Sequence, residues 1–236
     1  MNVHYCSDYQ EMSQRAYESI IADLKGHPEQ LICTATGSSP TGAYEKLARR
    51  FTKNPEYFKA LMLLKLDEWG GIDKKEPSSC ESYLQEKVIQ PLQIPKDRFI
   101  AFDSNPDSPE KECARIQGEI EQKGPIDLCI LGMGQNGHIG FNEPASSLSP
   151  HCHVAKLTPE SLNHQMIHTL GKKPSYGLTL GMGDILKSKK IILFLTGANK
   201  KAVIQKFLSK NVTTSLPASF LWLHPNVECF IDSTAV

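Results

Sequence analysis

The side chains best suited to chemistry gather in one glycine-rich segment, residues 131–148, which reads LGMGQNGHIGFNEPASSL. It combines four glycines, a histidine, a glutamate and two asparagines directly after an apolar run. Glycine at this density costs chain entropy on folding, so we expect a backbone path that larger residues would forbid. His138 and Glu143 can face one pocket, where a histidine–carboxylate pair suits acid–base catalysis. The alternatives are a glycine turn with a surface histidine and a metal site, which would need more ligands at close spacing.

A strand-end carboxylate is the second candidate, in the segment KLDEWGG at residues 65–71. Asp67 and Glu68 follow a run of apolar residues and precede a Trp-Gly-Gly turn. A carboxylate among apolar neighbours should have a raised pKa and could act as a general base. The alternative is an acidic helix cap or turn.

An anion-binding site is predicted in TATGSSPTGAYEKL, residues 34–47. Pro40 suits the first turn of a helix, and Ser39 suits its N-cap. Backbone N–H groups and hydroxyls at that positively polarised helix end would face an anion; they belong to Gly37, Ser38, Ser39 and Thr41. The segment is neither a Walker loop nor a GxGxxG motif. The alternative is a capped helix that binds nothing.

A fourth segment, LTGANKKAVIQKF at residues 195–207, adds positive charge. Lys200 and Lys201 open a predicted helix, where the helix dipole disfavours cations unless an anion is bound nearby. The alternative is a solvated basic face. Together the four segments fit a phosphorylated small molecule that reacts by proton transfer.

The pattern of apolar runs predicts the fold that brings these segments together. Strands buried on both faces are predicted at 30–36, 61–69, 126–133, 190–197 and 227–232. Helices are predicted before the first of these strands, at 9–25, and between the strands, at 40–53, 79–90, 107–123, 158–170, 181–188 and 198–209. This alternation predicts a single α/β domain over residues 1–236, with an open, mostly parallel sheet and helices on both faces. Ligands in such folds bind beyond the carboxyl ends of the strands, where the four segments lie.

Composition and charge exclude several classes of protein. The 236 residues carry 26 basic and 26 acidic side chains, so no net field attracts nucleic acid or an anionic membrane. The apolar runs are too short to span a bilayer, and the N-terminus lacks the basic start and apolar core of a signal peptide. Seven cysteines without a CxxC pair indicate reduced thiols, hence a cytoplasmic protein. We therefore expect no nucleic acid and no membrane as a partner.

In order and spacing, the segments TGSSPTGAY, LDEWGG, LGMGQNGHIGFNEPASSL and LTGANKKA resemble the glucosamine-6-phosphate deaminase and isomerase family, which is related to the 6-phosphogluconolactonases. The resemblance covers nearly the whole chain, and GHIGFNEPASSL is highly specific. The segments HCHVAKLTPESLNHQ, GLTLGMGDIL and TSLPASFLWLHPN are most similar to the branch of galactosamine-6-phosphate isomerases or deaminases. The resemblance implies a Rossmann-like fold without NAD. It also implies conversion of an amino-sugar phosphate to a ketose phosphate and ammonia, with no metal or organic cofactor.

The resemblance assigns roles to residues of this sequence. Asp67 would be the base that moves the proton between C2 and C1, and His138 would open the pyranose ring with help from Glu143. The 6-phosphate would be held by Gly37, Ser38, Ser39, Thr41 and Lys200. Three more residues are expected at the site, namely Asn136 as catalytic and Glu68 and Gly137 as substrate-binding. The expected partners are the phosphorylated amino sugar and, in a homo-oligomer, further copies of this chain.

The chain departs from the glucosamine branch of the family at three points. That branch has an aspartate where this chain has Asn136, whose amide can accept a hydrogen bond from the His138 ring but brings no charge. We therefore expect Glu143 to be the carboxylate partner, and His138 to titrate at lower pH than in that branch. Residues 151–175 lack the phosphate-binding arginine of that branch; the candidates to replace it are His164, His168, Lys172 and Lys173. The sequence also lacks the longer C-terminal tail, so we expect no allosteric control.

Four functions stay open on the sequence alone. The first is conversion of galactosamine 6-phosphate to tagatose 6-phosphate and ammonia; the second is conversion of glucosamine 6-phosphate, which differs only at the C4 hydroxyl, to fructose 6-phosphate. The third is hydrolysis of a sugar-lactone phosphate, in which there is no C2 proton to remove, so the pair of Asp67 and Glu143 favours enolisation. The fourth is a sugar-phosphate sensor, which would need a DNA-binding segment, and the chain has no basic patch for one.

Overall fold

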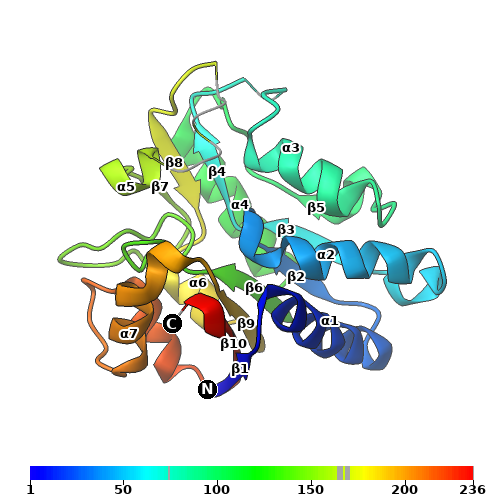
Figure 1. The fold of residues 1–236 in the computed structure, drawn as a ribbon. Helices are drawn as coiled ribbons and strands as arrows, with labels where there is room; N and C mark the ends of the chain where they lie inside the picture. The colour runs from blue at the N-terminus through cyan, green and yellow to red at the C-terminus, as the bar shows by residue number, and fades with distance from the viewer. Residues whose placement is uncertain (74, 164–166, 168–170, 236) are drawn as a thin grey trace.

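The computed structural model describes residues 1–73, 75–163, 167 and 171–235. Its centre is a seven-stranded sheet whose neighbouring strands all pair in parallel (Figure 1). From one edge to the other, the strands are β1 (Asn2–Cys6), β10 (Val227–Asp232), β9 (Lys190–Leu195), β6 (Leu128–Gly132), β2 (Leu31–Thr34), β3 (Met62–Lys65) and β5 (Phe99–Ile100). The predicted open α/β sheet is confirmed.

Helices connect these strands. They are α1 (Tyr9–Gly26), α2 (Ser38–Phe51), α3 (Cys80–Leu84), α4 (Pro109–Lys123), α5 (Pro159–Leu162), α6 (Met182–Leu186) and α7 (Lys201–Leu208). Short 3-10 or π turns occupy Pro55–Phe58, Gln85–Ile89, Lys96–Arg98, Ala198–Lys200, Pro217–Leu223 and Ser233–Ala235. Local sequence sets several helix starts: Asp8 caps α1 by accepting from the backbone N–H of Glu11, and Ser108 caps α4.

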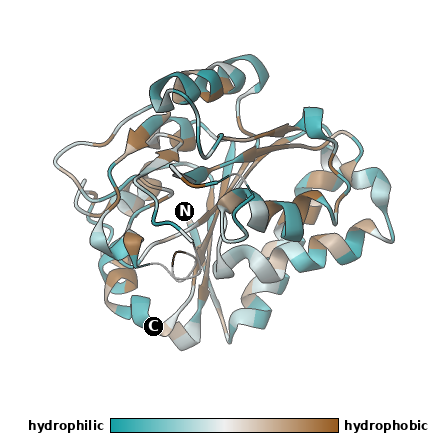
Figure 2. Ribbon diagram, turned by 90° about the horizontal axis from the view of Figure 1, so that it is seen from above, coloured by the Kyte–Doolittle hydropathy of each residue, from teal (hydrophilic) through white to brown (hydrophobic). Residues whose placement is uncertain are grey.

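Two apolar layers cover the two faces of the large sheet. Side chains of α1 and α2 pack on one face, and side chains of α4, α6 and α7 pack on the other. Because successive strand residues point to opposite faces, Ile32 of β2 belongs to the first layer, whereas Leu31 and Cys33 belong to the second. Figure 2 shows the apolar strands between helices that carry hydrophilic residues. The predicted helices on both faces are therefore confirmed.

A second, three-stranded sheet is antiparallel and consists of β4 (Asp67–Gly70), β8 (Tyr176–Thr179) and β7 (His153–Ala155). The prediction of one strand over 61–69 is therefore wrong, because the run divides at Leu66 into β3 and β4. The last β2–β3 pair is Thr34 with Lys65, so β3 loses its parallel neighbour there. The carbonyl of Leu66 instead accepts the backbone N–H of Leu180, at the start of the second sheet.

Other predicted boundaries differ at points where the local pattern is weak. Strand β1 lies at an edge and has no continuous apolar run, and the strands β5, β7 and β8 have at most four residues, so none was predicted. Within the helix predicted at 158–170, the structure shows α5, which ends at Leu162. Residues 164–166 and 168–170 lie outside the described residues. The N-cap of α2 is Gly37, with φ +104°, and not Ser39, which lies inside the helix.

All seven cysteines carry free thiols, and six of them are buried. This agrees with the reduced thiols predicted from the sequence. Within the described ranges, no helix combines the length and apolar character needed to cross a membrane.

Candidate active site

A cavity of about 760 Å³ opens beyond the carboxyl ends of β2, β3, β6 and β9. The chain passes from β2 to β3 on one side and later returns to β6 on the other, so the cavity lies at the point where strand order reverses, a usual ligand site in such sheets. Seven predicted residues line it, namely Gly37, Ser38, Ser39, Thr41, Asp67, His138 and Lys200. The four predicted residues outside its lining are Glu68, Asn136, Gly137 and Glu143.

Asp67, the first residue of β4, lines the cavity although its exposed fraction is only 8%. Its Oδ1 atom has no hydrogen-bond partner among the residues that the structure describes. Burial and the adjacent charge of Glu68 raise the pKa of Asp67 to about 7, although the charge of Lys65 opposes the rise. This agrees with the raised pKa expected from the sequence, and a carboxylate with that pKa can take up and return a proton near neutral pH.

Glu68 is not among the residues that line the cavity, so its predicted contact with substrate is not supported by its position. Its side chain is fully buried, and both carboxylate oxygens accept hydrogen bonds. Oε1 accepts the backbone N–H of Trp69 at 2.8 Å and that of Cys80 at 3.0 Å. Oε2 accepts the backbone N–H of Glu81 at 2.8 Å, so the carboxylate joins β4 to the first turn of α3.

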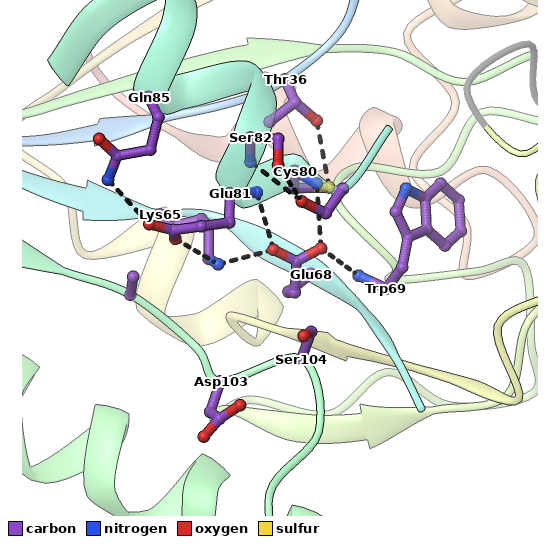
Figure 3. Close-up of polar contacts among 12 residues, drawn as sticks. Thr36, Lys65, Glu68, Trp69, Cys80, Glu81, Ser82, Gln85, Asp103 and Ser104 are labelled. Atoms are coloured by element: carbon purple, nitrogen blue, oxygen red, sulfur yellow. Dashed lines mark hydrogen bonds and ion pairs between the residues drawn. The ribbon is translucent and has the colours of Figure 1, made fainter. Parts of the chain in front are cut away.

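Lys65 completes this buried cluster at the end of β3. Its Nζ lies 2.7 Å from the Glu68 carboxylate and 2.9 Å from that of Glu81 (Figure 3). Burial alone would lower the pKa of Lys65, but the two carboxylates outweigh it and raise the pKa. Lys65 therefore remains charged, and Glu68 fixes two residues of the cavity wall, Trp69 and Cys80, through their backbone N–H groups.

The side chains of His138 and Glu143 are in contact, but they do not both face one pocket as expected, because only His138 lines the cavity. Nδ1 of His138 lies 3.2 Å from Oε2 of Glu143. A Cβ added at Gly134 would lie 2.2 Å from Nε2 of the ring, so only glycine allows the imidazole this close to the backbone. His138 itself lines the cavity, whereas Glu143 is buried and holds the ring from its Nδ1 side.

Asn136 does not accept a hydrogen bond from the imidazole, so that expectation is wrong. Its Nδ2 donates to Oε2 of Glu143 at 2.8 Å, and its Oδ1 accepts the backbone N–H of His138 at 3.1 Å. The amide therefore holds the carboxylate and the backbone of the loop instead of the ring. Gly137, with φ +87°, provides a backbone contact by accepting the N–H of Ala218, away from the cavity lining.

Two residues that the sequence analysis missed belong to the same network, Thr158 and Ser161 around the start of α5. The Ser161 hydroxyl donates to Oε1 of Glu143 and lies 3.3 Å from Nδ1 of His138. Burial would raise the pKa of Glu143, but the hydrogen bonds from His138, Ser161 and Asn136, with the charge of His138, hold it below its ordinary value. The sequence predicts a helix over 158–170, but no pattern in it marks Thr158 or Ser161 as part of the site.

The opposite end of the cavity carries the features of an anion site. Helix α2 has no acidic residue in its first turn, and its N-terminal residues line the cavity. The Thr41 hydroxyl donates to the carbonyl of Gly37 at 2.9 Å, so this side chain is engaged by its own helix. Nζ of Lys200 donates to the carbonyl of Met133 at 2.6 Å, and burial holds the pKa of this lysine below its ordinary value.

Among the candidates that the structure describes, none replaces the arginine that the sequence lacks. Lys172 and Lys173 are exposed and do not line the cavity. His164 and His168 lie outside the described residues. Across the described residues, no group of three or more histidine, cysteine or acidic side chains is arranged to hold a metal ion.

The chain is similar to known proteins over nearly its whole length. Residues 7–230 match the family described as glucosamine-6-phosphate isomerases/6-phosphogluconolactonase. The chain is 39% identical to AgaI of Escherichia coli (strain K12), which is named as a deaminase, over 96% of this chain and 90% of that protein. It is 35% identical to the glucosamine-6-phosphate deaminase of Geobacillus sp. (strain WCH70), over 100% and 95%.

Solved structures show the same fold. A monomeric glucosamine-6-phosphate deaminase of the NagB superfamily superposes with a TM-score of 0.94 at 33% identity, covering 100% of this chain and 98% of that one. The 6-phosphogluconolactonase of Leishmania guyanensis superposes with a TM-score of 0.80 at 20% identity, covering 99% and 97%. The second similarity is one of fold alone.

Proposed function

Because the chain belongs to the enzyme family of glucosamine-6-phosphate isomerases and 6-phosphogluconolactonases, we propose that it converts a 2-amino-2-deoxyhexose 6-phosphate to a ketose 6-phosphate and ammonia. One observation carries the proposal. A buried carboxylate with a pKa of about 7, Asp67, lines the same cavity as the ring of His138, which Glu143 holds from behind. That combination provides a base for a carbon acid and a separate acid–base group for the sugar ring.

The proposed reaction begins with ring opening. Nε2 of His138 exchanges a proton with the ring oxygen and the C1 hydroxyl, while Nδ1 donates to Glu143. Asp67 then removes the C2 proton of the open-chain aminoaldehyde and returns a proton to C1, while the C1 oxygen gains a proton and the C2 amino group loses one. The product of this transfer is a 2-imino sugar, which one water molecule hydrolyses to the 2-ketose and ammonia. Neither step needs a metal or an organic cofactor.

The proposed phosphate site is the N-terminus of α2 together with Lys200. The residues proposed to contact the phosphate are Gly37, Ser38, Ser39, Thr41 and Lys200. Backbone N–H groups at a helix N-terminus favour an anion. The desolvated ammonium of Lys200 gains from the same charge, since its present partner is a neutral carbonyl.

Galactosamine 6-phosphate is the proposed substrate, with tagatose 6-phosphate as the product. The support for it is the similarity of three segments, within 151–165, 177–186 and 214–226, to the galactosamine branch of the family. Glucosamine 6-phosphate is the second candidate, favoured by relatives such as the Geobacillus protein that is named a glucosamine-6-phosphate deaminase. The two sugars differ only in the configuration of C4.

Lactone hydrolysis is the weaker alternative. The 6-phosphogluconolactonase structures share the fold at 20% identity or less. A lactone hydrolase removes no C2 proton, so its reaction has no role for a buried carboxylate whose pKa is about 7. We further propose that the whole chain acts as one domain in the cytoplasm, where its seven free thiols stay reduced.

The test is ammonia release by the purified protein, with galactosamine 6-phosphate and glucosamine 6-phosphate offered in parallel. We expect release from both and a higher kcat/KM for the galacto sugar. Asp67→Asn should release none at the wild-type enzyme concentration, while inorganic phosphate still protects it in a thermal shift assay. Release by this variant at the wild-type rate would contradict the role of Asp67. Hydrolysis of 6-phosphogluconolactone without any ammonia release would contradict the proposed reaction.

A further inference from the structure

Helix α5 brings a hydroxyl to the proton-transfer pair from outside the glycine-rich loop. Ser161 is the third residue of this four-residue helix, and its exposed fraction is 2%. Its Oγ donates to Oε1 of Glu143 and lies 3.3 Å from Nδ1 of His138. The hydroxyl therefore contacts both members of the pair.

We propose that Ser161 is a positioning residue for proton transfer, which fixes the Glu143 carboxylate and the tautomer of the His138 ring. The inference rests on the proposed function for its kinetic consequence. Its structural consequence, the tautomer of an imidazole, can be measured without substrate.

The first step of the argument concerns the orientation of Glu143. Each of its two oxygens has a donor from a different segment: Asn136 donates to Oε2 at 2.8 Å, and Ser161 donates to Oε1. A carboxylate held at both oxygens cannot rotate about its terminal bond without losing a charge-assisted hydrogen bond. Oε2 thereby stays 3.2 Å from Nδ1 of His138.

The second step concerns the imidazole. Two oxygen atoms lie within reach of Nδ1, one from Glu143 at 3.2 Å and one from Ser161 at 3.3 Å. A neutral imidazole carries one N–H, and two acceptors on the same side favour the tautomer in which Nδ1 carries it. Nε2 is then the basic nitrogen; it packs against Gly134, and both Gly134 and His138 line the cavity.

The third step concerns why the hydroxyl stays in place. Oγ1 of Thr158 caps α5 by accepting the backbone N–H of Ser161 at 3.3 Å. The same Oγ1 lies 3.4 Å from Nδ2 of Asn136. The cap therefore ties α5 to the glycine-rich loop, and the position of the Ser161 hydroxyl is set by both segments.

The experiment compares Ser161→Ala with Ser161→Thr, which keeps the hydroxyl, and with Ser108→Ala. Ser108 caps α4 through the backbone N–H of Lys111 and does not line the cavity, so it controls for the removal of a structural serine hydroxyl outside the cavity. The first readout is the ¹⁵N chemical shifts of the His138 ring without substrate, which distinguish the two tautomers. The second is kcat and KM for ammonia release.

We expect the Nε2–H tautomer of His138 to gain population in Ser161→Ala and to stay at the wild-type level in Ser108→Ala. Because a hydrogen bond to a charged group is lost, kcat should fall by about tenfold while KM changes by less than about twofold. Ser161→Thr should restore most of the loss in kcat. A wild-type tautomer in Ser161→Ala, or a lower melting temperature with unchanged kcat, would overturn the proposal.

Failure of the proposed function gives a different result. If the wild-type protein releases no ammonia from either sugar phosphate, the reaction is wrong, but the tautomer measurement still tests the positioning role. A shifted tautomer with wild-type kcat would also count against Ser161, because the proposal links the two.

Discussion

Asp67 and Glu68 are adjacent in the chain, but their carboxylates lie on opposite faces of β4. Asp67 lines the cavity. Glu68 instead faces Lys65 and the first turn of α3 (Figure 3). Glu68 is fully hydrogen-bonded, and Asp67 has one oxygen without a partner among the described residues. Two neighbouring carboxylates thus differ in solvation and partners, which separates a structural role from a reactive one.

The pH dependence of activity should reflect the pKa of Asp67 and the effect of the Glu68 charge on it. If ionised Asp67 is the base, kcat/KM rises with pH through a value of about 7, since its pKa is raised to about 7 by burial and by the charge of Glu68. Glu68→Gln removes that neighbouring charge, so the acidic limb should move to lower pH. Lys65→Met removes the charge that opposes the rise, so the limb should move to higher pH.

The two variants serve as controls for each other, because both disrupt the same buried cluster. General loss of structure would reduce activity in both without moving the limb in opposite directions. Rate profiles from pH 5 to 9, with folding checked by circular dichroism at each pH, measure the shifts. Movement in the same direction would refute the electrostatic account.

The buried charge of Asp67 should also cost stability. Its pKa is raised from 3.8 to about 7 on folding, so the contribution of its protonated form to stability is lost as pH rises through about 7. Asp67→Asn removes the charge and should stabilise the fold at pH 8, by at most about 4 kcal/mol, with a smaller gain at pH 5. Urea unfolding at both pH values measures this. A variant that is less stable than the parent at pH 8 would contradict the assignment.

The observed contacts of Asn136 differ from those expected from the sequence, and they lead to a prediction. Asn136→Asp replaces an amide that donates to Glu143 at 2.8 Å with a second carboxylate. The two carboxylates repel each other and both favour a protonated imidazole, so His138 should titrate at higher pH in the variant than in the parent. Histidine ¹H–¹³C spectra recorded from pH 4 to 9 follow the ring directly. An unchanged titration curve would mean that the new carboxylate turns away from the pair.

Much of the site could be predicted because it depends on strand ends. Apolar runs that finish in glycine or polar residues marked the carboxyl ends of β2, β3, β6 and β9, and parallel strands bring such ends to one edge. Asp67, His138 and Lys200 therefore line one cavity, although they come from three separate segments. The sequence could also have predicted that the Glu68 side chain points away from the cavity, since adjacent strand residues face opposite sides.

The other features of the fold and the site depend on contacts that produce no periodic pattern in the sequence. The division of 61–69 into two strands is decided by the last residue of β2, which is distant in sequence. An amide can donate or accept, so the type of residue 136 does not tell which atom meets Glu143. Ser161 lies on a helix of one turn, too short for any helical pattern to mark its buried side.

The glycine-rich loop allows a last test, on the space beside the imidazole. A Cβ at Gly134 would lie 2.2 Å from Nε2 of His138, so Gly134→Ala must displace the ring or the loop. We expect kcat to fall by at least about tenfold, because small displacements of an acid–base group are costly. The matched control is Gly118→Ala in α4, where an added Cβ meets no atom within 4 Å. Since alanine favours helix over glycine by about 1 kcal/mol, this control should raise the melting temperature and leave kcat unchanged. Wild-type kcat in Gly134→Ala would show that the imidazole does not need its place against the loop backbone, and would remove His138 from the proposed proton transfer.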